Sequence, residues 1–130
     1  MTDVEVLNYL QTLQRHRSLI EARMARAMAH FHHLRRDFEG GKYASEGIAA
    51  ALSWSPMTAA NTLGTAIRLV ERLPKTVAAV ESGTLDMPKA RAILDWTETL
   101  PVDVAREIAE VVREWSVGPH PGRVAAGVGP

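Results

Sequence analysis

Histidine side chains are the residues of this chain most able to bind a metal ion, and three of them lie within four positions. His30 and His33 are three residues apart and His33 and Asp37 are four apart, which places each pair on one face of a helix. Three such side chains can hold zinc or another transition metal. No His-Glu-x-x-His arrangement accompanies them, and helices commonly display solvated histidines. We therefore expect a polar helix face here, with no metal or other cofactor.

Catalysis by side chains has little support. Cysteine is absent, which excludes disulfides, thiolate nucleophiles and cysteine-bound metal centres. The sequence also lacks a glycine-rich phosphate loop and a Gly-x-Ser-x-Gly nucleophile motif, and its acidic residues are scattered. We expect a protein that is not an enzyme, and no small-molecule substrate is indicated.

The residues after Pro56 carry side chains of the types that contact DNA. An asparagine amide can pair with an adenine edge, threonine hydroxyls can bind phosphate, and arginine or lysine can contact the DNA backbone. These roles predict contacts with double-stranded DNA from Met57, Thr58, Asn61, Thr65, Arg68, Arg72 and Lys75.

A pair of helices over residues 44–73 must position these side chains. Ser45 can cap a first helix, and Ser55 followed by Pro56 is a typical start for a second. The pattern from Ile48 to Leu63 is Ile-Ala-x-x-Leu-x-x-Ser-x-x-Thr-Ala-x-x-x-Leu, with Ser53 where a turn glycine is usual. This spacing predicts a helix-turn-helix-like unit, whose second helix would enter the major groove. The alternative is that the two helices are only part of a helical core.

A long helix precedes this pair. Residues 3–38 contain neither proline nor glycine, and their apolar residues recur at steps of three and four. Such a helix would be about 50 Å long, whereas a globular chain of this size has a diameter of about 35–40 Å. We expect a second copy to cover its apolar seam in a homodimer; the alternative is that later helices of the same chain cover it. Arg17 is a polar break in the seam, which consists of Val6, Leu10, Leu13, Ile20, Met24, Ala27, Phe31, Leu34 and Phe38.

The rest of the chain predicts further helices over 75–82, 87–96 and 101–116, the second of them capped by Asp86. Together they give an all-α fold of about six helices in one domain, residues 1–116, followed by a flexible Gly/Pro-rich tail over 117–130. We expect the apolar side of the last helix to cover the long first helix. We also expect Trp54, Trp96 and Trp115 to anchor the core.

Charge and hydropathy limit the kinds of partner. The 130 residues carry 15 Lys+Arg against 15 Asp+Glu, so no basic field covers the whole molecule. No window approaches the roughly 20 apolar residues of a membrane span, and no signal peptide is evident. These features predict a cytoplasmic protein that does not enter membranes.

The central motifs also resemble a known family. Ile48-Ala49-x-x-Leu52-x-Trp54-Ser55, Arg72-Leu73-Pro74-x-Thr76 and Lys89-Ala90-Arg91-x-Ile93, in this order, are similar to the core of the domain-of-unknown-function 222 family. The resemblance covers roughly residues 42–112. More loosely, the elements after the helix pair resemble the DNA-binding region of ParB-type partition proteins.

The family resemblance implies a nuclease-associated helical module, because members often carry an HNH nuclease domain downstream. This chain has no HNH pattern; the only histidine after His33 is His120. We therefore expect a dimeric DNA-binding or DNA-targeting module without nuclease activity. The alternative is a protein-interaction or structural helical domain that dimerises through its long first helix.

Overall fold

Six α-helices make up the part of the chain that the computed structural model describes, residues 1–37 and 43–116, and no strand occurs among these residues. The all-α expectation is thereby confirmed. The predicted tail over 117–130 lies outside the described residues. The helices are α1 (Asp3–Arg36), α2 (Ala44–Leu52), α3 (Pro56–Arg72), α4 (Pro74–Glu81), α5 (Met87–Thr97) and α6 (Val102–Ser116).

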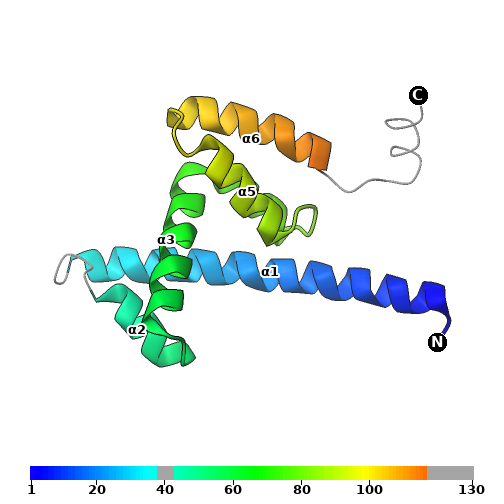
Figure 1. Cartoon of the computed structure of the whole chain (residues 1–130), viewed down its shortest axis with the longest axis horizontal. Helices are drawn as coiled ribbons and strands as arrows, with labels where there is room; N and C mark the ends of the chain where they lie inside the picture. Colours follow the sequence, from blue (N-terminus) through cyan, green and yellow to red (C-terminus); the bar gives the residue numbers. More distant parts are fainter. Residues whose placement is uncertain (38–42, 117–130) are drawn as a thin grey trace.

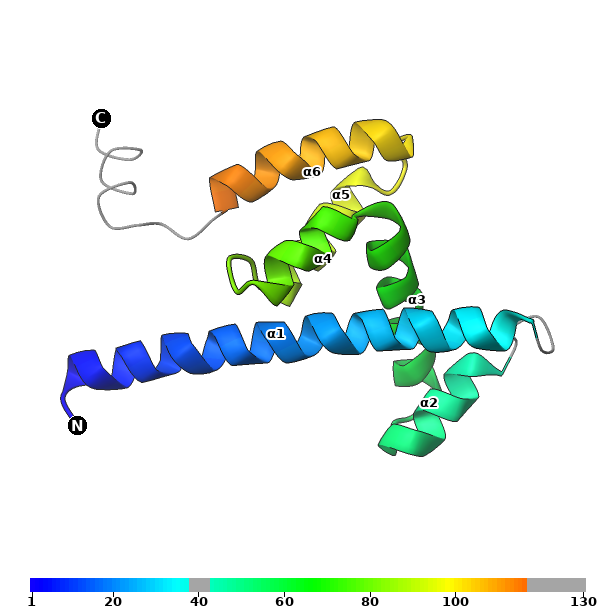
Figure 2. The ribbon, with the colours of Figure 1, turned by 180° about the vertical axis from the view of Figure 1, so that it is seen from behind.

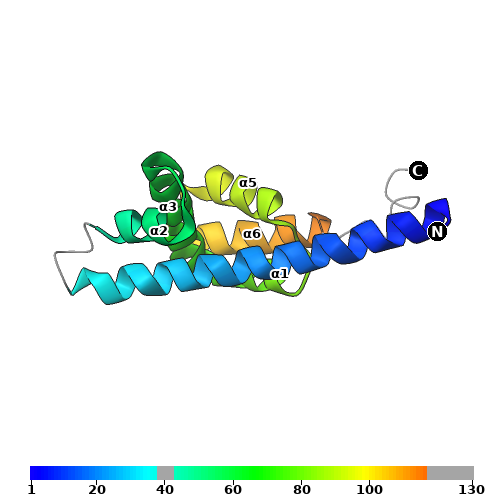
Figure 3. The ribbon, with the colours of Figure 1, turned by 90° about the horizontal axis from the view of Figure 1, so that it is seen from below.

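Helix α1 is a single rod that spans the long dimension of the molecule (Figure 1). It begins with a capping box, in which Thr2 accepts from the backbone N–H of Glu5 and Glu5 accepts from that of Thr2. It ends at Arg36, and the predicted seam residue Phe38 lies outside the described residues. The other helices gather along its middle and C-terminal part, and its N-terminal end extends past them, as the view from below shows (Figure 3).

Helices α2 and α3 form the predicted pair, and the turn between them has the expected geometry. Ser53 adopts the left-handed conformation with φ of 57°, which reverses the chain. Ser55 is the N-cap of α3, because its hydroxyl accepts from the backbone N–H of Thr58 at 3.1 Å. The predicted cap of α2 was wrong: the helix already begins at Ala44, so Ser45 lies inside it, and Tyr43 provides no side-chain cap.

The core lies where α3, α4 and α5 meet the side of α1. Its largest fully buried aliphatic side chains come from these three helices and from Leu73, which joins α3 to α4. The face of α1 that packs on them consists of Ser18, Ala22, Ala25 and Met28. Small side chains allow helices to approach closely. The alternative in which later helices of the same chain cover the apolar seam is therefore wrong for most of the seam, since Ile20, Ala27 and Leu34 are exposed and only Met24 and Phe31 are half-buried.

Helix α6 lies on the far side of α4 and α5 from α1, as the view from behind shows (Figure 2). It packs on α5, α4 and α3 through the buried Ala105 and Ala109, so the expectation that it covers α1 was wrong. The expected tryptophan anchors were also wrong. Trp96 and Trp115 are 66% and 78% exposed and Trp54 is half-buried, because alanine, leucine and valine fill the close helix crossings instead.

Gly83 is the residue of the α4–α5 turn that tolerates substitution least. Its φ is +82°, and a Cβ added there would lie 3.1 Å from Cγ of Arg15. We expect Gly83→Ala to lower the free energy of unfolding by about 1–2 kcal/mol, because alanine is strained at this φ. Urea unfolding at one fixed protein concentration measures the change.

Gly64→Ala is the matched control for that substitution. Gly64 lies inside α3, and a Cβ there would meet nothing within 4 Å. Alanine loses less backbone entropy than glycine in a helix, so this variant should gain about 0.5–1 kcal/mol. Equal changes of stability in the two variants would contradict the backbone argument.

Candidate functional site

The predicted DNA-contact residues lie mainly along one face of α3. Asn61, Thr65, Arg68 and Arg72 are spaced by four, three and four residues, so they follow a single stripe on the helix. The structure divides this stripe into two halves with different surroundings. Its first half lies at the surface, and its second half lies beneath the connection between α5 and α6.

The first half of the stripe is accessible. Met57 is 74% exposed, and Thr58 and Asn61 are exposed as well. The hydroxyl of Ser55 donates to the hydroxyl of Thr58 at 2.9 Å, next to the backbone cap. Thr65, one turn after Asn61, is half-buried. These residues are neutral, so this end of α3 offers hydrogen-bonding and apolar groups without a cation.

The two arginines of the second half bind other parts of the same chain. Arg68 forms an ion pair with Glu98 just after α5. Nη2 of Arg72 donates to the backbone carbonyls of Thr97 at 3.0 Å and of Leu100 at 2.9 Å. Carbonyls at the end of a helix have no partner within the helix, so Arg72 caps the end of α5.

The same arrangement continues at the end of α3. From α6, Arg106 donates to the carbonyls of Arg72 at 2.8 Å and of Glu71 at 3.0 Å. Lys75, on α4, is exposed and lines a cavity together with Glu107 and Glu110. The basic residues predicted to contact DNA backbone are therefore bound within the fold or lie beside acidic side chains of α6.

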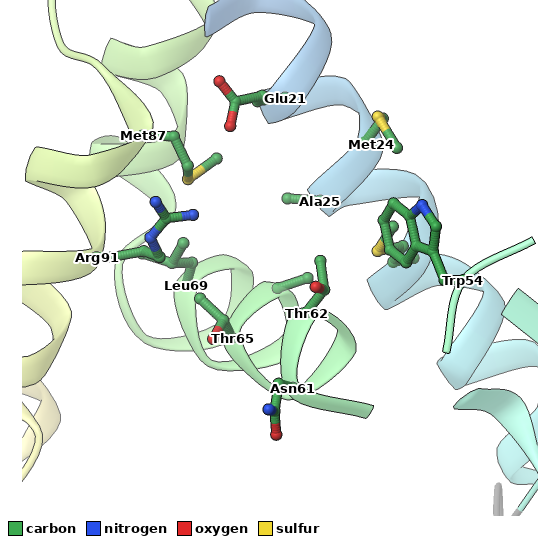
Figure 4. Close-up of a pocket in the computed structure, with 12 residues that line it drawn as sticks. Glu21, Met24, Ala25, Trp54, Asn61, Thr62, Thr65, Leu69, Met87 and Arg91 are labelled. Carbon is green, nitrogen blue, oxygen red and sulfur yellow. The ribbon is translucent and has the colours of Figure 1, made fainter. Parts of the chain in front are cut away.

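A cleft of about 400 Å³ opens between α1, α3 and α5 (Figure 4). Trp54 lies at one end of it and Arg91 at the other, with Thr62 and Thr65 on the α3 side. Arg91 is exposed and forms no ion pair or hydrogen bond with the described residues. The apolar walls of the cleft come from Met24, Ala25, Met28, Ala66, Leu69 and Met87.

The histidines of α1 do not form a cluster with other ligands. His30 and His33 are exposed, while His32 is half-buried with its Nδ1 buried and without a hydrogen-bond partner. Among residues 1–37 and 43–116, no three histidine or acidic side chains come together as a metal site would require.

The N-terminal half of α1 carries a second candidate surface. Its first buried residue is Ser18, and the apolar side chains before it are exposed, Leu7 at 60% and Leu10 at 53%. We call four of them, which share one side of the helix, the α1 stripe: Val6, Leu7, Leu10 and Leu13.

Comparison with known proteins places the chain in a family. The family model described as "Domain of unknown function (DUF222)" matches residues 6–117, which is most of the chain. The chain belongs to the DUF222 family. No curated protein and no solved structure matches it. In the part of this DUF222 chain that the structure describes, no helix has both the length and the apolar character needed to cross a membrane.

Local sequence patterns did not reveal the positions and contacts of several residues of the DUF222 chain. Met24 was expected in the apolar seam and Met87 at the start of a helix, yet they line one cleft together with the exposed Arg91. They come from two helices far apart in the sequence, and no local spacing links them. The capping roles of Arg72 and Arg106 were missed for the same reason, because their partners lie 25 to 35 residues away.

Proposed function

We propose that this DUF222 chain is a helical protein-interaction module that associates with a second copy of itself through the N-terminal half of α1. The observation that carries the proposal is the α1 stripe, whose large apolar side chains are exposed on a helix that extends past the rest of the fold. Contiguous exposed apolar surface of this kind marks sites of protein contact.

Helix stability supports the same proposal. Residues 3–17 precede the first buried residue of α1, and an isolated helix of about 12–15 residues is only marginally stable in water. Most helical stability in proteins comes from packing an apolar face on another element. A second copy would supply that element for this half of α1.

Sedimentation equilibrium of the whole chain tests self-association. We expect a concentration-dependent mass that approaches twice 14.2 kDa at micromolar concentration. A mass that stays at 14.2 kDa over this range would refute the proposal.

Binding of duplex DNA is a second candidate function, favoured by the α2–α3 corner. The turn at Ser53 and the cap at Ser55 give the pair a helix-turn-helix-like form, with Thr58 and Asn61 exposed near the start of α3. That is the end which a recognition helix inserts into the major groove. In this role a dimer would present two such helices, and the domain would bring an associated nuclease domain to DNA.

A mobility shift with mixed-sequence duplex tests the DNA proposal. Binding should fall steeply as salt rises, because phosphate contacts release counterions. Asn61→Ala should weaken binding by about 1–3 kcal/mol, the value of a bidentate contact with a base. Asn8→Ala removes an exposed amide from α1 and is the matched control. Absence of binding at low salt, or equal binding by the two variants, would refute DNA contact through Asn61 and give the α2–α3 pair a structural role only.

A further inference from the structure

We infer that two copies pair their α1 helices antiparallel, with Leu10 meeting Leu10 of the second copy at a two-fold axis. This register rests on the proposed self-association and goes beyond it, because it states which residues meet. Three observations carry it: the symmetry of the stripe about Leu10, the charges at its two ends, and the space beside it.

The three leucines of the α1 stripe are symmetric about Leu10, and the counterpart of Val6 is Gln14. Leu7 and Leu13 are each three residues from it, about 4.5 Å along the helix axis. In an antiparallel pair centred on Leu10, Leu7 of each copy therefore lies opposite Leu13 of the other. A two-fold interface requires a patch that is complementary to itself in this way.

The charges at the ends of the stripe match the same register. Asp3 and Arg17 lie seven residues before and after Leu10, which is about two helical turns, and both are on the side of the stripe. The antiparallel register places Asp3 of each copy opposite Arg17 of the other. A parallel pair would instead place arginine beside arginine and aspartate beside aspartate. The arginine that interrupts the apolar seam thus gains a second acidic partner besides Glu21, and such charges select the orientation of a helix pair.

The surroundings of the stripe leave room for a second helix. Arg17 is 75% exposed at its side chain and its Nε lies 3.2 Å from Glu21 of the same helix, which leaves other guanidinium N–H groups for Asp3 of the second copy. Beside Leu7, Leu10 and Gln14 runs a groove of about 620 Å³, bounded on its other side by Gly83. Leu7 and Leu10 line this groove, so a helix that lies along the stripe would cover its α1 side.

Cysteine crosslinking tests the register, since the chain has no cysteine of its own. Under a mild oxidant we expect Leu10→Cys to form a covalent dimer. Leu7→Cys and Leu13→Cys should each crosslink poorly alone, because like positions stand about 9 Å apart along the axis. A mixture of these two variants should crosslink well. Self-crosslinking of both single variants would indicate a parallel pair and overturn the inference.

Charge reversal gives a second readout. Asp3→Arg and Arg17→Asp should each weaken self-association about tenfold, and the double variant should recover most of the affinity. If the chain dimerises but Leu10→Cys does not crosslink and the double variant does not recover, the register is wrong while self-association stands. If the wild-type chain sediments as a monomer, both are wrong.

Discussion

Leu10→Asp is expected to convert the self-associating chain into a monomer. Under the proposed pairing each dimer buries two Leu10 side chains, and burial of a leucine is worth about 1.5–3 kcal/mol. Losing both costs at least about 3 kcal/mol, so the dissociation constant should rise at least about 100-fold. The substitution also places two carboxylates side by side at the axis. Sedimentation equilibrium measures the change.

Leu34→Asp is the matched control. Leu34 is 52% exposed on the same helix, close to the exposure of Leu10, but it lies in the C-terminal half and off the α1 stripe. It should leave the dissociation constant unchanged. Circular dichroism should show both variants folded, since neither side chain packs in the core. If Leu10→Asp stays dimeric, the interface lies elsewhere, and the exposed side of α6 around Ile108 and Trp115 is the next surface to test.

Arg72→Met is expected to destabilise the fold by about 3 kcal/mol. The substitution removes two hydrogen bonds from a charged donor to the carbonyls of Thr97 and Leu100. Hydrogen bonds to charged groups contribute about 1.5–3 kcal/mol. The carbonyl of Thr97 keeps a second donor, the backbone N–H of Leu100 at 3.1 Å, so the larger loss falls on the carbonyl of Leu100. Methionine keeps much of the side-chain volume, so the loss reports on the bonds. The free energy of unfolding in urea measures it.

Arg91→Met makes the same chemical change at an exposed arginine without a partner in the described residues, so stability should stay within about 0.5 kcal/mol. Equal stability of the two variants would mean that the contacts of Arg72 contribute nothing net. The stability of Arg72→Met also decides how its DNA binding is measured. Only conditions in which this variant is folded show whether Arg72 contacts DNA.

The predicted DNA-contact face of α3 shows which features of the site local sequence patterns predict. The positions of Asn61 and Thr65 on one helix face followed from their spacing, and the start of that helix followed from Ser55 and Pro56. The spacing did not show whether the side chains on this face are free to contact a partner. Arg68 and Arg72 continue the same face, yet both side chains bind the C-terminal end of α5 and the residues just after it. Their charge made them appear as DNA contacts, and only the packing of α5 revealed their partners.

Helix α1 shows the same division. Its length and continuity were evident from 34 residues without proline or glycine. The buried face of α1 was not evident from the sequence. The larger apolar residues Ile20 and Leu34 favoured a different side of the helix from the small Ala22 and Ala25, which are the buried ones. Hydrophobicity scales weight the larger side chains, whereas close packing of helices selects the smaller ones.

By itself the sequence determined that the chain is helical, where most helices begin and end, and that α1 is too long for one domain to cover. Each of these properties depends on backbone torsions and hydrogen bonds within a few residues, which local side chains control. The tertiary structure alone decided which face of α1 is buried, that Arg72 caps α5, and that Leu10 remains at the surface. These outcomes depend on how six helices divide a small core among them, and that division involves side chains far apart in the chain.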